Sequence, residues 1–177
     1  GIVLTLPISP AAVCAALSLT GLAGGAAVAG CCAQMVGFAV CTYRENKMNG
    51  LVSIGLGTSM LLVPNLMSKP ILWLPPTLAA AVTGPIATCI FNLQMNGSPI
   101  SSGMGTSGLV GPIGVVTGWF TPSEAALNAG ASAIAPGAMD WIGLVLICFV
   151  LPAALALLFS EIMRKQGWIK EGDYKLV

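Results

Sequence analysis

One pattern of ten positions occurs twice in this chain, and it limits what the chain can fold into. Residues 55–65 read GLGTSMLLVPN and residues 103–113 read GMGTSGLVGPI, so both copies fit G-x-G-T-S-x-L-x-x-P. Each copy lies in strongly apolar sequence. Hydrophobic segments that Gly and Pro interrupt at corresponding positions are typical of the substrate site of a membrane transporter. The repeat therefore points to a membrane protein with a duplicated site.

Lipid has to be the solvent for much of the chain, because only 7% of its residues are charged and 56% are hydrophobic. An ordinary soluble domain carries roughly 25% charged residues. The apolar runs are continuous and lack the alternation of barrel strands. We therefore expect an all-α integral membrane fold, a polytopic helical bundle that forms a single membrane domain over residues 1–177. The net charge of +1 gives no indication of a nucleic-acid partner.

Residue types that carry most metal and hydrolytic chemistry are scarce. The chain has no His, which excludes a Ser-His-Asp triad and hydrolytic zinc chemistry within these residues. Its cysteines lie in apolar segments without C-x-x-C spacing, and we interpret them as small buried hydrophobes. They are Cys14, Cys31, Cys32, Cys41, Cys89 and Cys148. We predict no catalytic residue, no metal and no cofactor.

Three apolar stretches are long enough to cross a bilayer, which takes about 20 helical residues. They cover 11–42, 71–91 and 141–163. In the first, Gly24-Gly25 could bend the helix, and small residues recur every fourth position, as where two membrane helices pack closely. These small residues are Gly21, Gly25, Ala29, Ala33 and Gly37. Gln34 lies beside them and needs a partner if buried; it either joins two helices or contacts a solute.

Charge sets the expected orientation, because positive residues mark the cytoplasmic side. Basic residues follow the first crossing and, from Arg164 onward, the last. Residues 92–139 are polar, rich in Gly and almost uncharged. We therefore place residues 43–50 and a tail at 164–177 in the cytoplasm, and residues 92–139 outside or folded back into the membrane.

Two apolar pieces, 51–67 and 108–120, are too short for ordinary crossings. The second would reach only about 20 Å at 1.5 Å per residue, against about 30 Å of hydrocarbon. We expect two re-entrant hairpins, one with its cytoplasmic-side loop at 43–67 and one with its outer-side loop at 92–120. Because one crossing separates them, they enter from opposite sides as an inverted repeat, and their G-T-S tips meet near the midplane.

The tips carry groups that suit a small polar ligand. Their glycines let the backbone approach a ligand closely, Thr58 and Thr106 are good N-caps for the half-helices that follow, and hydroxyls both donate and accept. A neutral polyol such as a sugar fits this inventory, and so does a small anion; alternatively, G-T-S only caps a kinked helix. The candidate substrate-binding residues are Gly57, Thr58, Ser59, Asn65, Gly105, Thr106, Ser107 and Gln34.

The acidic residues do not suggest a proton relay. Residues 121–124 (TPSE) read as a capping box, with Pro at the first helical position, that opens a short helix through Asn128. This context favours a capping role for Glu124, and Asp140 can cap the last crossing. Glu45 lies among basic residues at the inner face, where we expect it to be solvated. Without a charge inside the membrane, proton transfer has no evident carrier.

Four stretches carry a resemblance to a known family: GLAGGAAVAGCCAQMVGFAV, YRENKMNGLVSIGLGTSMLLVPN, LWLPPTLAAAVTGP and SGMGTSGLVGPIG. From about Pro7 to Leu158 the chain resembles the EIIC-like membrane permeases of the phosphotransferase system, and among them the PfoR-type regulators. The resemblance implies the C-terminal part of a larger permease in a bacterial inner membrane. It also implies a sugar-like substrate, a homodimer and a cytoplasmic EIIB-type partner. The family's His has no counterpart here, so no catalytic residue is carried over.

Three functions remain open at this point. The first is transport of a sugar or similar small polar solute held between the two tips. The second is a membrane-embedded sensor or regulator that uses the same pocket without net transport and signals through the inner loop and the tail. The third is a structural subunit that only packs against other helices.

Overall fold

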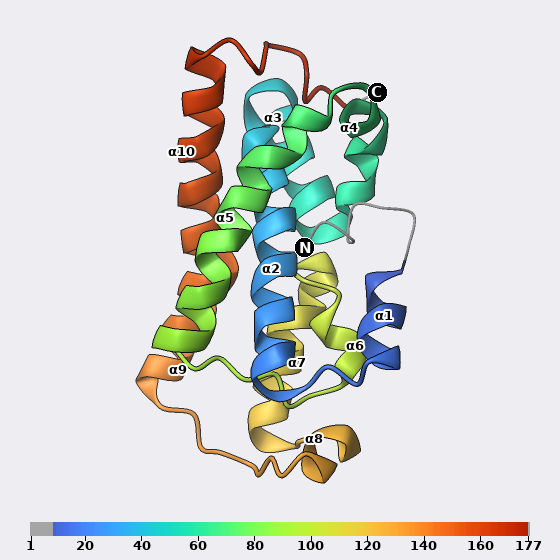
Figure 1. Cartoon of the computed structure of the whole chain (residues 1–177), viewed down its shortest axis with the longest axis vertical. Coiled ribbons are helices and arrows are strands. Elements are labelled where there is room, and N and C mark those ends of the chain that lie inside the picture. The colour runs from blue at the N-terminus through green and yellow to red at the C-terminus, as the bar shows by residue number, and fades with distance from the viewer. Residues whose placement is uncertain (1–8, 177) are drawn as a thin grey trace.

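The computed structural model describes residues 9–176, which form helices joined by loops, without strands among them (Figure 1). Within this part of the chain, three helices are long and apolar enough to cross a membrane. They span Gly21–Cys41, Pro70–Ile90 and Ala138–Lys165. The helical fold class and the three crossing segments that the sequence predicted are confirmed at this level.

The first apolar stretch is divided into two helices. It forms α1 (Pro10–Ala16) and α2 (Gly21–Cys41). Between them, Ser18 has a φ of 48°, in the left-handed region that cannot continue a right-handed helix. Gly24-Gly25, where the sequence allowed a bend, does not break the helix, since α2 runs through both residues. These glycines serve packing instead: a Cβ at Gly25 would collide with the carbonyl oxygen of Leu93.

Helix α2 is central, and it packs against α5 (Leu74–Pro85) and α10 (Leu151–Lys165). A Cβ added at Gly37 would lie 2.9 Å from the Cβ of Pro76 on α5 and 3.2 Å from the Cβ of Ala156 on α10. Membrane helices associate largely through such close packing. Gly37 therefore has the packing role that we predicted for the small residues of this helix.

Residues 43–68 leave the C-terminal end of α2 and come back to it (Figure 1). Thr58 interrupts the segment with an extended φ of −149°, and Gly55 just before it lies beside Ala39, late in α2. The helical pieces before Thr58 are α3 (Tyr43–Val52) and a π-helical turn, η2 (Ser53–Gly57); those after it are a 3-10 turn, η3 (Ser59–Leu62), and α4 (Val63–Ser68).

Residues 99–120 make the opposite excursion, from the N-terminal end of α2 and back (Figure 1). On the way in, the Ser102 hydroxyl donates at 2.9 Å to the carbonyl of Leu19, two residues before the start of α2. On the way out, Gly118 packs against the backbone of Gly97, two residues after Met95, which pairs with Gly21. The helical pieces are α6 (Pro99–Ser102), a 3-10 turn, η6 (Ser107–Leu109), and α7 (Val110–Phe120).

The short helix after α7 begins later than predicted. Helix α8 (Glu124–Asn128) has Ser123 as its N-cap, with the hydroxyl accepting from the Ala126 N–H at 3.4 Å. The predicted capping box at 121–124 is therefore wrong in register, although the helix ends where expected. The same Ser123 hydroxyl donates to the carbonyl of Gly97 at 2.8 Å, and this contact with the preceding loop selects the later start.

The last crossing consists of α9 (Ala138–Val145), a π-helical turn, η7 (Leu146–Val150), and α10. Asp140 caps it, as predicted, by accepting from the Gly137 N–H at 2.8 Å. All the basic residues lie at the far end of the bundle from this cap, where α2 ends (Figure 1). They are Arg44, Lys47, Lys69, Arg164, Lys165, Lys170 and Lys175.

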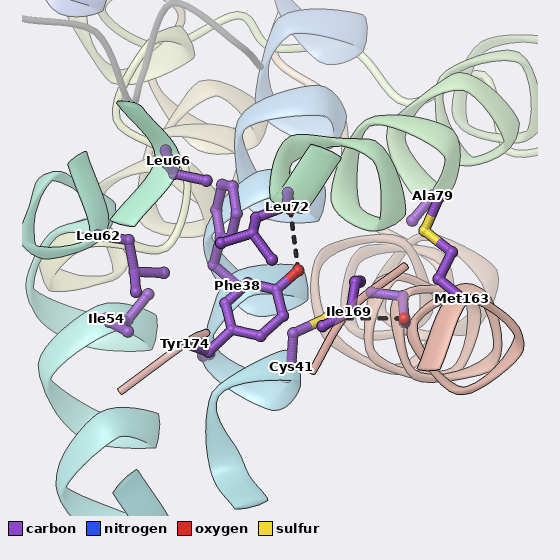
Figure 2. Close-up of a cluster of buried hydrophobic side chains, with 12 residues drawn as sticks. Phe38, Cys41, Ile54, Leu62, Leu66, Leu72, Ala79, Met163, Ile169 and Tyr174 are labelled. Carbon is purple, nitrogen blue, oxygen red and sulfur yellow. Dashed lines mark hydrogen bonds between the residues drawn. The ribbon is translucent and has the colours of Figure 1, made fainter. Parts of the chain in front are cut away.

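At this basic end the tail folds back over the first excursion. Tyr174 is fully buried and its hydroxyl donates to the carbonyl of Leu72 at 2.9 Å (Figure 2). Arg164 pairs with Glu45 at 2.8 Å, with both side chains only 8% exposed. We expected Glu45 to be solvated, and this was wrong, because the bundle brings Arg164 against it. Burial alone would raise the pKa of Asp173, but hydrogen bonds from Lys69 and from the Lys170 N–H lower it.

Candidate functional site

The two copies of the repeated pattern contact each other. The Thr106 hydroxyl donates to the carbonyl of Gly55 at 2.6 Å, and the Ser107 hydroxyl donates to the carbonyl of Gly57 at 2.8 Å. Both bonds run from side chains of the second copy to the backbone of the first. Gly105 packs against Cys31, which lies halfway along α2. The two excursions therefore meet beside the middle of the central helix, and we call this place the tip junction.

In the first copy, one hydroxyl bonds to the neighbouring backbone and the other makes no hydrogen bond. Thr58 accepts from the Met60 N–H at 3.2 Å, which makes it the N-cap of the turn that follows, as predicted. Ser59 is fully buried, and its hydroxyl has no hydrogen-bond partner. A buried hydroxyl without a partner costs roughly 1–3 kcal/mol. Ser59 thus carries an unused hydrogen-bonding group in the first copy, next to Thr58.

In the second copy, Thr106 does not cap a helix, and this expectation was wrong. Its side chain makes no capping bond, and α7 begins only at Val110. The reason is the backbone that follows Thr106: Gly108 and Leu109 have φ values of 53° and 59°, both left-handed. These residues delay the helix, so that the Thr106 hydroxyl is free to donate across the junction.

An open cavity of about 520 Å³ adjoins the tip junction. Thr58 and Ser107 contribute one hydroxyl-bearing residue from each copy to its wall. Three methionines supply most of its apolar lining: Met35, Met60 and Met104. No ionisable side chain lines this cavity among the described residues. A wall of this kind can bind a small uncharged molecule through hydroxyl and carbonyl groups, while flexible thioethers adapt to its shape.

The structure separates two predicted site residues from the tips. Gln34 is fully buried, and its amide donates to the Thr77 hydroxyl on α5 at 3.0 Å, while its oxygen has no partner. Asn65 donates to the carbonyls of Asp173 and Lys175, at 2.8 and 2.9 Å, and so lies at the tail. The other six candidates belong to the two tips that the fold brings together. They are Gly57, Thr58, Ser59, Gly105, Thr106 and Ser107.

Sequence reasoning missed the methionines of the cavity and the backbone carbonyls that accept at the junction. Met60 and Met104 occupy variable positions of the repeated pattern, next to the fixed Ser59 and Gly105. Met35 follows Gln34 directly on α2. Proximity to the pattern was the only signal for these residues. Among the described residues, no group of three His, Cys, Asp or Glu side chains could hold a metal ion.

Comparison with known proteins gives one match. A family model described as "Phosphotransferase system, EIIC" matches residues 1–176. Neither the curated proteins nor the solved structures gave a match. The match covers both copies of the pattern and the three helices that are long and apolar enough to cross a membrane.

Proposed function

The chain belongs to the phosphotransferase-system EIIC family, the membrane components of sugar transport, and we propose that it moves a neutral sugar or similar small polar solute through the tip junction. One observation carries this proposal: two distant copies of a hydroxyl-bearing pattern contact each other beside an uncharged cavity. A helix-capping role alone would leave the contact between the copies unexplained. Among the described residues no ionisable side chain lines the cavity, which favours a neutral polyol over the anion that the sequence left open.

We place the two excursions in the membrane as re-entrant hairpins that form an inverted repeat. The support is that residues 43–68 begin and end at the basic end of the bundle, whereas residues 99–120 begin and end at the other. Basic residues mark the cytoplasmic side, so the first hairpin enters from the cytoplasm and the second from outside. The C-terminus is then cytoplasmic, in a bacterial inner membrane. Non-helical backbone at this depth is tolerated where it lines a cavity.

The hydrogen bonds at the junction suggest how a solute would pass. With the two tips bonded to each other, the donors of Thr106 and Ser107 are occupied. Sugar hydroxyls can replace both partners, donating to the Gly55 and Gly57 carbonyls and accepting from the two side chains. A solute that binds better to separated tips would shift the protein toward that state. Phosphorylation of the sugar would then belong to a separate EIIB-type partner, and the family resemblance also suggests a homodimer.

The test is uptake of labelled neutral sugars into liposomes that contain the purified protein. In the separated state, the Ser59 hydroxyl, which has no protein partner, would also bond the solute. Ser59→Ala combined with Ser107→Ala then removes two hydrogen bonds to the solute, at about 1 kcal/mol each, and we expect uptake to fall at least about tenfold. Ser107→Thr keeps the hydroxyl and serves as the matched control.

Unchanged uptake in the double variant, with the wild-type unfolding temperature in detergent, would overturn the proposed site. Saturable sugar binding without any uptake by the wild type would indicate a sensor instead.

A further inference from the structure

A second cavity lies at the end of the bundle opposite the basic residues. It has a volume of about 190 Å³ and is more enclosed than the cavity at the tip junction. Its walls come from the loop after the second crossing, the end of α7 and the start of α9, including Asn92, Gln94, Trp119 and Asp140. It shares no lining residue with the tip junction. We call it the Trp119 cavity.

Three polar side chains of this cavity have unused hydrogen-bonding capacity. Asn92 is exposed and makes no side-chain hydrogen bond among the described residues, so a ligand would replace water there. Gln94 accepts one weak bond, from the Asn96 amide at 3.3 Å, and its own N–H groups remain free. Asp140 uses one carboxylate oxygen to cap Gly137 at 2.8 Å. Two amides and one carboxylate oxygen can therefore donate to and accept from the same small molecule.

Aromatic surface completes the cavity. Trp119 and Phe91 both line it, and the Trp119 ring is held by an edge-on contact with Trp141, with 5.1 Å between ring centroids. Because Trp119 is only 4% exposed, it supports the wall from behind, and the partly buried Phe91 ring is the aromatic surface that can pack against the C–H face of a sugar ring. The few convergent polar groups then select for hydroxyl positions.

Charge narrows the ligand class. Between Pro70 and Ser160 the only charged residues are Glu124 and Asp140, so this end of the bundle carries negative charge alone. A carboxylate in the wall repels phosphorylated sugars and other anions. We infer that the Trp119 cavity is a second binding site for a neutral polyhydroxy solute, separate from the tip junction. Only the choice of solute class rests on the proposed function.

The position of this cavity suggests a role as an entry site. Trp119 lies at the end of α7, and Ser107 lies just before its start. The helical residues from Val110 to Trp119 span about 14 Å. A solute bound beside Trp119 is thus held at the mouth of the second excursion, one helix length from the junction.

The test is titration of tryptophan fluorescence in the purified protein with mannitol, glucose, glucose 6-phosphate and choline. We expect a saturable response to the neutral polyols alone. Asn92→Gly combined with Gln94→Met should weaken it by about tenfold, because two hydrogen bonds are lost. Gly suits position 92, whose φ is 49°, and Gln94→Met alone serves if the pair does not fold. Asn128→Gly, outside the cavity, is the matched control.

The same titration in the Ser59→Ala and Ser107→Ala double variant separates the two sites. A response that persists there and disappears in the Asn92 and Gln94 variant supports the inference. A response to choline in place of polyols overturns it, as does a loss confined to the junction variant. If polyols give no response while wild-type uptake continues, this inference fails and the proposed function stands.

Discussion

The two copies of G-x-G-T-S have the same letters at the fixed positions and different structures. In the first copy, the backbone around Gly57 has open space, with nothing within 4 Å of an added Cβ. In the second, Gly105 has a φ of 55°, and an added Cβ would lie 2.8 Å from the carbonyl carbon of Cys31. The first copy supplies carbonyl acceptors, and the second supplies hydroxyl donors. Repetition of sequence has therefore produced complementary partners, not equivalent halves.

The difference comes from what each copy packs against. Gly103 and Gly105 of the second copy meet the backbones of Pro10 and Cys31 at less than 3.0 Å from an added Cβ, whereas Gly55 meets only the Ala39 side chain, at 3.3 Å. The second tip is thus the fixed one, seated between α1 and α2. The first tip is less tightly enclosed, and the tail holds it mainly at its base.

The largest expected effect in this comparison is that of Gly105→Ala. A left-handed conformation costs a residue with a Cβ roughly 1–2 kcal/mol, and overpacking adds about 1–3 kcal/mol. We expect destabilisation by about 2–4 kcal/mol, measured as a lower unfolding temperature in a fixed detergent. The matched change is Gly57→Ala, which should stay within about 0.5 kcal/mol of the wild type. Equal losses in the two variants would mean that the tips are packed alike.

The sequence predicted the larger features because they depend on length and charge alone. Span length gave the three crossing helices, and one intervening crossing led us to expect that the two tips meet, as the bonds from Thr106 and Ser107 show. The role of Thr106 could not be predicted, since it depends on the left-handed backbone at Gly108 and Leu109. A glycine in the pattern permits that conformation without requiring it.

Asn65 shows a second reason why a contact could not be predicted from the sequence. Its partners, the carbonyls of Asp173 and Lys175, are more than a hundred residues away in the sequence. No local pattern near Asn65 indicates that contact. The side chain could therefore be recognised as polar and membrane-adjacent, but its neighbours come only from the folded chain.

A smaller effect should separate the two threonines. Thr106→Val removes a fully buried donor from the part-buried hydrogen bond to the Gly55 carbonyl, at a cost of roughly 1–3 kcal/mol. Thr58→Val removes an exposed N-cap, which costs about 1 kcal/mol. Thr106→Ser and Thr58→Ser keep the hydroxyls and should restore most of each loss. Chemical denaturation of the four variants measures the order, and a larger loss for Thr58→Val than for Thr106→Val would contradict the assignment of Thr106 as the donor between tips.

The smallest expected effect, and the one with the most bearing on function, is that of Ser59→Ala. The Ser59 hydroxyl is buried and has no partner, so its removal should leave the unfolding temperature unchanged or raise it by the equivalent of up to about 1 kcal/mol. Ser107→Ala loses a partly exposed bond to Gly57 and should cost about 0.5–1 kcal/mol. Because the Ser59 hydroxyl lowers stability when the tips are bonded to each other, we expect it to form a hydrogen bond in a different state, with the solute bound. If the solute supplies the missing partner, Ser59→Ala should weaken sugar binding severalfold while it raises stability. If stability rises and binding is unchanged, Ser59 has no part in the site, and the donors of the second copy remain as the binding groups.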